Sequence, residues 1–162
     1  MTTFDETLPM ILHRTLDAVM PRYRTLFARH ELTEQQWRVL RVLWEVDRTS
    51  SVELARRTLL PAPSLVGIVD RLESRGLVAR VRSTTDRRVV YVTATAEGRA
   101  LGEEVVPHVD EINRHVRAGV PAEAWQAMQA TLEAIAANAA DDRANPSDQN
   151  SQPDQTAPTR SA

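Results

Sequence analysis

The sequence contains no cysteine among its 162 residues. A disulfide framework and a thiolate metal site are therefore excluded. The four histidines (His13, His30, His108 and His115) do not share the spacing of a metal site, so we expect neither a metal nor a cofactor. His108 and His115 lie seven residues apart on one helix face, too far for one ion within a chain, although a dimer would bring copies together.

Long apolar runs and common enzyme motifs are absent as well. No stretch is apolar enough to span a bilayer, and no basic segment followed by an apolar run opens the chain, so we expect a cytoplasmic protein without a membrane partner. The sequence has no glycine-rich phosphate loop, no nucleophile elbow and no recognisable catalytic carboxylate pair. An enzyme is therefore not expected.

Lysine is also missing, and the arginines are unevenly distributed. The chain has 20 basic and 22 acidic residues, a net charge of −2. Residues 48–99 contain ten arginines and five acidic residues, whereas residues 100–162 contain four arginines and ten acidic residues. Positive charge is thus concentrated on one segment, as a phosphate-binding surface requires.

This basic segment begins with the pattern of two short helices joined by a turn. Ser50 and Glu53 form a capping-box pattern that opens a helix through Thr58. Residues 59–63 include two prolines and predict the turn, since proline suits only the first turn of a helix. A second helix is expected over residues 62–75.

The second helix is expected to bury one face and expose the other. Gly76 ends it, because glycine readily adopts the left-handed conformation past a helix end. A buried apolar stripe is predicted by the spacing of Leu65, Ile68, Val69 and Leu72. The opposite face is thin and polar, with no bulky apolar side chain, and consists of Pro63, Ser64, Gly67, Asp70, Arg71 and Ser74. Such a face fits the major groove of DNA.

A β-hairpin follows this helix. Residues 77–82 and 90–93 alternate apolar with polar or small side chains, and the polar turn between them carries arginines. Longer helices are expected on both sides of the basic segment, over residues 5–29, 34–46, 96–118 and 121–140. The last two present apolar stripes that a small domain cannot cover alone, which favours a helical dimer interface.

The order of these elements resembles the MarR family of winged-helix transcription regulators. The resemblance is carried by residues 32–38 (LTEQQWR), 63–65 (PSL), 70–78 (DRLESRGLV), 86–88 (DRR) and 95–98 (TAEG), and the flanking helices extend it from about residue 5 to 140. Together with residues 60–65 (LPAPSL), the first motif is most similar to the subgroup that regulates homoprotocatechuate catabolism. Ala94 departs mildly from the family, which often has an aliphatic residue there.

The resemblance implies a mostly α fold with a small β-hairpin wing. Residues 31–99 would form a winged helix-turn-helix lobe that binds DNA, and residues 1–30 and 100–140 a helical dimerisation region. Residues 141–162 are polar and predict a disordered tail.

The resemblance also implies a function, and two alternatives to it stay open. The expected protein is a homodimeric repressor that leaves a palindromic operator when a small phenolic or aromatic carboxylate binds, and that controls aromatic-compound catabolism. One alternative is a winged-helix module that binds proteins instead of DNA. The other is a regulator that responds to a metal or to stress.

The candidate DNA contacts lie on the two helices and the hairpin: Arg56, Arg57, Pro63, Ser64, Gly67, Arg71, Arg75, Arg80, Arg82, Asp86, Arg87 and Arg88. Arg71 is expected to contact either guanine or a phosphate. Asp70 would repel phosphate and is expected to orient a neighbouring arginine. The resemblance implies that Asp86 orients an arginine at the hairpin tip while Arg88 enters the minor groove; the alternative is a solvated salt bridge.

An effector pocket is implied between the dimer helices and the lobe. Its candidate residues are His13, Arg14, Trp37, Arg38, Arg41 and Trp44. An arginine beside aromatic surface suits an aromatic carboxylate. The alternative is that the tryptophans belong to the core or to an interface and that the arginines face solvent.

Overall fold

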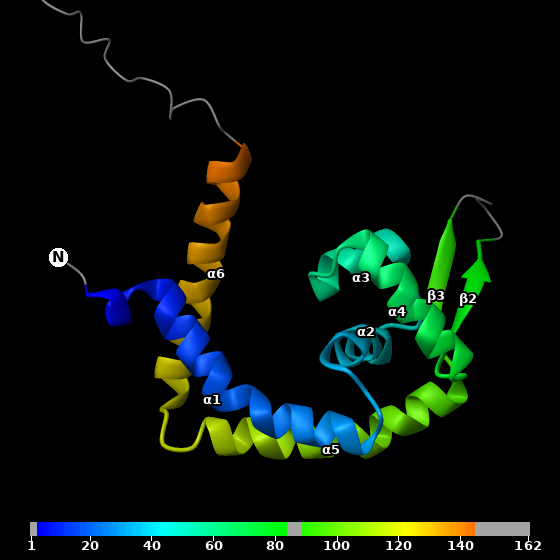
Figure 1. Ribbon diagram of the computed structural model, residues 1–162, viewed down its shortest axis with the longest axis horizontal. Helices are drawn as coiled ribbons and strands as arrows, with labels where there is room; N and C mark the ends of the chain where they lie inside the picture. The colour runs from blue at the N-terminus through cyan, green and yellow to red at the C-terminus, as the bar shows by residue number, and fades with distance from the viewer. Residues whose placement is uncertain (1–2, 84–88, 145–162) are drawn as a thin grey trace, which may run out of the picture. The chain divides into compact units, whose positions relative to one another are not determined.

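The structure is a computed structural model that describes residues 3–83 and 89–144 (Figure 1). It confirms the predicted mostly helical class with a small antiparallel sheet. The elements are η1 (Phe4–Glu6), α1 (Leu8–Arg29), α2 (Glu34–Glu45), β1 (Thr49–Ser50), α3 (Ser51–Thr58), α4 (Ala62–Ser74), β2 (Val78–Arg82), β3 (Val90–Ala94), α5 (Ala96–Val116) and α6 (Ala122–Ala144). The chain divides into two compact units between residues 116 and 117.

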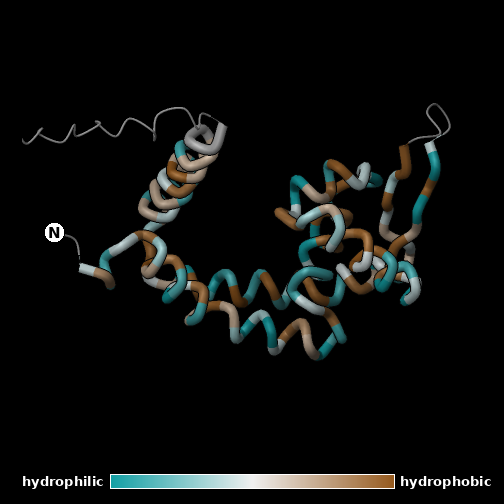
Figure 2. Tube along the Cα trace, turned by 45° about the horizontal axis from the view of Figure 1, so that its top comes forward, coloured by the Kyte–Doolittle hydropathy of each residue, from teal (hydrophilic) through white to brown (hydrophobic). Residues whose placement is uncertain are grey.

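Helix α1 runs through Pro21 to Arg29 and packs along α5 (Figure 1). Pro21 therefore does not end the helix, and the carbonyl of Pro21 accepts a hydrogen bond from the Thr25 hydroxyl at 3.0 Å. Only Leu26 and Phe27 of α1 are buried. The apolar side chains nearer its N-terminus are 38–54% exposed: Leu8, Ile11, Leu12 and Leu16. Apolar and polar stretches alternate along both α1 and α5 in Figure 2.

Helix α2 begins with a capping box. The Thr33 hydroxyl accepts from the Gln36 amide at 3.2 Å, and the Gln36 side chain accepts from the Thr33 amide at 2.9 Å. These bonds satisfy two amides that a helix start otherwise leaves without partners. Behind the cap, Val39, Leu40 and Leu43 are buried in the core.

The predicted helix-turn-helix is formed by α3 and α4. The Ser50 hydroxyl accepts from the Glu53 amide at 3.2 Å, which is the Ser50 half of the expected capping box. The Glu53 carboxylate instead accepts two hydrogen bonds from Arg56. Leu59 ends α3 with a left-handed backbone (φ 54°), and Leu60 turns into the core.

Strands β2 and β3 form the predicted hairpin, paired from Val78 opposite Ala94 to Arg82 opposite Val90. A short strand that the sequence did not predict, β1, pairs with the other side of β3 and gives a three-stranded sheet in the order β1-β3-β2. This pairing attaches the segment before α3 to the base of the hairpin. The helix-turn-helix and the hairpin therefore share one scaffold.

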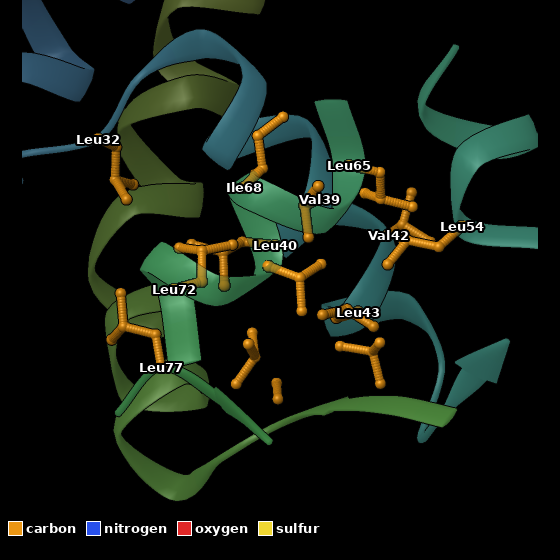
Figure 3. Close-up of a cluster of buried hydrophobic side chains, with 14 of the residues drawn as sticks. Leu32, Val39, Leu40, Val42, Leu43, Leu54, Leu65, Ile68, Leu72 and Leu77 are labelled. Carbon is orange, nitrogen blue, oxygen red and sulfur yellow. The ribbon is translucent and has the colours of Figure 1, made fainter. Parts of the chain in front are cut away.

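The apolar side chains of α2, α3, α4, the sheet and α5 meet in one core (Figure 3). All four residues of the predicted α4 stripe are buried within it: Leu65, Ile68, Val69 and Leu72. Burying such a side chain fully stabilises the fold by about 1.5–3 kcal/mol relative to leaving it in water. The core fixes α4 by its inner face and leaves the outer face in solvent.

Helix α5 begins at Ala96, as predicted, and the Thr95 hydroxyl just before it accepts from the Gly98 amide at 3.0 Å. In the second unit, α6 extends to Ala144, past the predicted helix end at Ala140 and into the segment expected to be disordered. The rest of that tail, residues 145–162, lies outside the described residues. None of the described helices is both long and apolar enough to cross a membrane.

Candidate nucleic-acid interface

The face of α4 that the sequence predicts for the major groove is exposed to solvent in the structure. Pro63 stands in its first turn, and Gly76 follows its end with a left-handed φ of 71°. Pro63, Ser64 and Arg71 are exposed, and Gly67 is half-buried. A Cβ built on Gly67 would lie 3.7 Å from Arg71 Nη1, so the guanidinium lies across the surface that this glycine leaves open. Within the described chain, Arg71 has no ion-pair partner.

One expectation for this face is wrong. It was predicted to lack bulky apolar side chains, but Val66 is 57% exposed. Val66 follows Pro63 by three residues and precedes Asp70 by four, so it shares a side of α4 with both. The sequence analysis assigned the apolar residues of this helix to the buried stripe and did not place Val66 on either face.

Arg80 at the base of the hairpin joins the hairpin to α4. Its guanidinium donates to Asp70 Oδ1 at 2.6 Å and to Glu73 Oε2, and its backbone amide donates to Glu73 Oε1 at 3.0 Å. Burial acts to lower the pKa of Arg80, but the hydrogen bonds to Asp70 and Glu73 outweigh it, and the pKa is raised. Asp70 thus orients a neighbouring arginine, as expected. The Arg80 guanidinium is therefore occupied by ion pairs within the chain, and these pairs hold the hairpin against α4.

The arginines of α3 are exposed and paired. Arg56 donates to both carboxylate oxygens of Glu53, at 2.8 and 2.6 Å, and these hydrogen bonds lower the pKa of Glu53 and raise that of Arg56. Arg57 donates to Glu45 at 2.6 Å. Exposed pairs of this kind contribute little to stability, because water screens the two charges. A phosphate can therefore displace either carboxylate at little cost.

Arg75 is placed differently from the other candidates. Its guanidinium donates to the carbonyl of Glu31 at 2.7 Å and to that of His30 at 3.2 Å. It holds the chain that follows α1 against the end of α4. We therefore leave Arg75 out of the proposed DNA contacts.

The hairpin brings Arg82 to the last position of β2, opposite Val90. Its side chain is exposed and has no ion-pair partner in the part of the chain that the structure describes. Asp86, Arg87 and Arg88, the expected tip residues, lie outside the described residues.

The expected effector residues divide between two hollows. Trp37 and Arg38 line one of about 190 Å³ with Met20, Tyr23, Phe27 and Glu34. Arg41 and Trp44 line another of about 400 Å³ with Arg99, Gly102, Glu103 and Val106. His13 and Arg14 are exposed on α1 and line neither hollow. The structure thus brings together pairs from the predicted set but not the whole set.

Aromatic rings connect the two hollows. The ring centroids of Phe27 and Trp37 lie 4.8 Å apart in a stacked arrangement, and Trp37 and Trp44 meet edge to face at 5.4 Å. The Trp44 indole donates to the Gly98 carbonyl at 2.7 Å, and both tryptophans pack against the core. Each tryptophan thus supports the core and also lines a hollow, so the two interpretations drawn from the sequence are compatible.

Sequence reasoning missed Tyr23 and Phe27 as lining residues. They lie four residues apart on α1, with ring centroids 6.1 Å apart, and that spacing is the signal that could have found them. The Tyr23 hydroxyl donates to Asn113 Oδ1 of α5, and burial raises the pKa of Tyr23. His108 and His115 line a separate hollow between α1 and α5, and no group of three metal-ligating side chains occurs among the described residues.

Comparison with known proteins supports the winged-helix interpretation. The MarR family model matches residues 32–90. The homoprotocatechuate degradative operon repressor of Escherichia coli is 37% identical over 128 residues, which cover 79% of this chain and 86% of that protein.

Solved structures give the same fold. NadR in complex with 4-hydroxyphenylacetate matches with a TM-score of 0.73 and 31% identity, over 84% of this chain and 96% of that one. BpsR of Bordetella bronchiseptica, whose DNA binding is regulated by 6-hydroxynicotinic acid, matches with a TM-score of 0.75 and 28% identity, over 83% of this chain and 96% of that one. These relatives are regulators, which confirms that the chain is not an enzyme. The chain belongs to the MarR family of transcription regulators.

Proposed function

We propose that this regulator is a homodimeric repressor that binds a palindromic operator and is released by a small aromatic acid. The observation that carries the proposal is the placement of Arg71 and Arg82. Both are exposed and without ion-pair partners among the described residues, on two elements that Arg80 joins. Unpaired guanidinium groups on a fixed frame are suited to phosphates and to guanine edges.

DNA contact would extend outward from α4. Its outer face enters the major groove, with Ser64 and Gly67 near the base edges and Arg71 on guanine or on a phosphate. Arg56 and Arg57 exchange their exposed carboxylate partners for phosphates. The wing arginines reach the adjacent minor groove.

Dimer formation is supported by the N-terminal half of α1. Its exposed apolar side chains recur at helical spacing, and a single chain leaves them in water: Leu8, Ile11, Leu12 and Leu16. A two-fold dimer would present two copies of α4 to successive major grooves, about 34–36 Å apart. An operator with two inverted half-sites follows from that symmetry.

The hollow beside Trp37 is the proposed effector site. Its volume of about 190 Å³ suits a single aromatic ring rather than a larger ligand. Arg38 stands at the hollow and is held by Glu34 at 2.6 Å in a partly exposed pair, so a ligand carboxylate can compete for its guanidinium. The relatives that bind 4-hydroxyphenylacetate and 6-hydroxynicotinic acid support this chemistry.

Release requires that the effector bind better to an arrangement that does not fit the operator, because a ligand shifts an equilibrium only through different affinities for the two states. The hollow suits this role, since its walls come from α1 and from α2 of the DNA-binding lobe. A ligand that fills it would change how these helices pack. The spacing of the two α4 copies would change with them.

The test is fluorescence anisotropy with the full chain and a duplex enriched from a random palindromic library. Arg71→Ala should weaken binding at least tenfold, whereas Arg14→Ala, an exposed arginine on α1, should leave affinity unchanged. The logarithm of the affinity should fall linearly with the logarithm of salt concentration, with a slope of about −0.9 per neutralised phosphate. A slope near zero would refute an arginine–phosphate interface.

The effector part is tested separately. 4-Hydroxyphenylacetate, homoprotocatechuate and indole acetate are titrated into the protein–DNA complex. At least one should release the DNA, and Trp37→Ala should abolish release while the variant still binds the duplex. Release that persists unchanged in Trp37→Ala would move the effector site elsewhere.

A further inference from the structure

An apolar groove of about 340 Å³ lies between the start of α3, α4 and the hairpin. Its lining is almost entirely aliphatic: Ser51, Val52, Ala62, Leu65, Val66, Val69, Arg80 and Val90. Leu65 and Val69 are buried and belong to the core. Val66 and Val52 are different, because they remain 57% and 82% exposed and contribute little to the core.

The groove adjoins the proposed DNA surface. Val66 stands between Ser64 and Gly67 on the outer side of α4, and the hairpin that carries Arg82 forms the opposite wall. Arg80 lines the same groove, where it neutralises Asp70 and Glu73 of α4. Any occupant of the groove therefore meets an apolar surface whose nearby carboxylates are already paired.

The surroundings restrict the occupant to a partner that is negatively charged overall but apolar at this point. Arg71 and Arg82, which have no ion-pair partner among residues 3–83 and 89–144, stand on the two elements that flank the groove, and their charge favours a polyanion. In the major groove of DNA, the apolar group that the bases present is the C5-methyl of thymine. Valine packs against such a methyl without leaving any hydrogen-bonding group unsatisfied.

We propose that Val66 is a specificity-determining residue that reads thymine through its C5-methyl at the groove between α4 and the hairpin. The inference rests on the proposed DNA-binding function and deepens it, because it assigns a base preference to the apolar residue on the otherwise polar face of α4. Each methyl transferred from water to this groove should contribute about fourfold in affinity, equivalent to about 0.8 kcal/mol. Two symmetry-related half-sites would double the free-energy effect.

The experiment uses the full chain and its library-selected duplex. Every thymine is replaced in turn by deoxyuridine, symmetrically in both half-sites, which removes the methyl and retains base pairing. The dissociation constant of each duplex is measured at fixed salt. In the wild type, at least one symmetric replacement should weaken binding about 16-fold, because it removes two methyl groups that each contribute about fourfold.

Two variants decide whether Val66 reads that methyl. The side chain of Val66 is exposed, and alanine is a good helix former, so the Val66→Ala variant should keep the fold. It should bind the thymine and deoxyuridine duplexes equally. The control is Val120→Ala, which removes the same atoms from another exposed valine outside the first unit. This variant should bind the deoxyuridine duplex more weakly than the thymine duplex by the same factor as the wild type.

Two results would overturn the inference. Either no deoxyuridine replacement weakens binding, or the loss persists undiminished in Val66→Ala. A library that enriches no duplex at all would instead refute the proposed DNA-binding function, and that result differs from both.

Discussion

Three glycines lie within helices, and the room around them differs sharply. A Cβ added at Gly98 would stand 2.0 Å from the Leu77 carbonyl oxygen, which is backbone. At Gly102 it would stand 2.8 Å from the Trp44 ring. At Gly67 the nearest atom would be the flexible end of Arg71, at 3.7 Å. The same substitution, glycine to alanine, should therefore have opposite effects on stability.

The magnitudes follow from two opposing terms. Alanine is more favourable than glycine inside a helix by about 1 kcal/mol, and at Gly67 nothing opposes this gain. At Gly98 the new methyl must push α5 away from the chain at Leu77, and overpacking of this kind costs about 1–3 kcal/mol or more. At Gly102 the indole must move, although its hydrogen bond to Gly98 holds it. The expected order of stability is Gly67→Ala, wild type, Gly102→Ala, Gly98→Ala.

Urea unfolding followed by circular dichroism checks this order. Protein concentration must be equal throughout, because the proposed dimerisation would contribute to apparent stability. The midpoints should shift while the slope against urea stays the same. A Gly98→Ala variant as stable as the wild type, or a destabilised Gly67→Ala variant, would refute the steric reasoning.

The Gly67 variant also separates stability from function. An alanine methyl there would thicken the face proposed for the major groove and would lie in van der Waals contact with the Arg71 guanidinium. Operator affinity should therefore fall several-fold although the fold becomes more stable. Because misfolding cannot explain such a result, it would identify Gly67 as part of the DNA-contacting surface.

Other substitutions test individual contacts. Thr33→Ala removes the cap of α2 and should lower the free energy of unfolding by about 1 kcal/mol in the same urea assay, and an unchanged midpoint would contradict the capping role. Tyr23→Phe removes the hydrogen bond between α1 and α5 and should cost about 0.5–1.5 kcal/mol in thermal unfolding. Arg80→Gln removes the ion pairs to Asp70 and Glu73 that join the hairpin to α4. Operator affinity should therefore fall by a larger factor than the equilibrium constant for folding. Equal operator affinity for wild type and variant would show that this connection is not needed for DNA binding. Arg88→Ala, in the segment that the sequence predicts for the hairpin tip, should weaken operator binding strongly while size-exclusion chromatography still shows the proposed dimer.

Periodicity predicted the helices of the lobe well, because burial on one side imposes a regular spacing. The stripe on α4 and the caps at Thr33 and Thr95 are local signals, and the structure contains them all. Strand β1 could not be predicted, since two residues are too few to show a period and only pairing with β3 defines it.

The candidate site was less predictable than the fold, since it depends on which partner each arginine meets. Arg75 and Arg80 resembled free surface cations in the sequence. Their partners, the carbonyls after α1 and the carboxylates of α4, become neighbours only through the fold. The residues that line the hollow at Trp37 likewise come from two helices, and a search along one helix at a time could not collect them.

The position of Arg75 has a mechanical consequence. Its two hydrogen bonds fasten the carbonyls of His30 and Glu31 to the end of α4, and Leu26 and Phe27 anchor the same end of α1 in the core. A displacement of this end of α1 would therefore pull directly on the end of α4 through the Arg75 hydrogen bonds. If the proposed dimer forms through the N-terminal half of α1, this connection links the dimer contact to the helix proposed to enter the major groove.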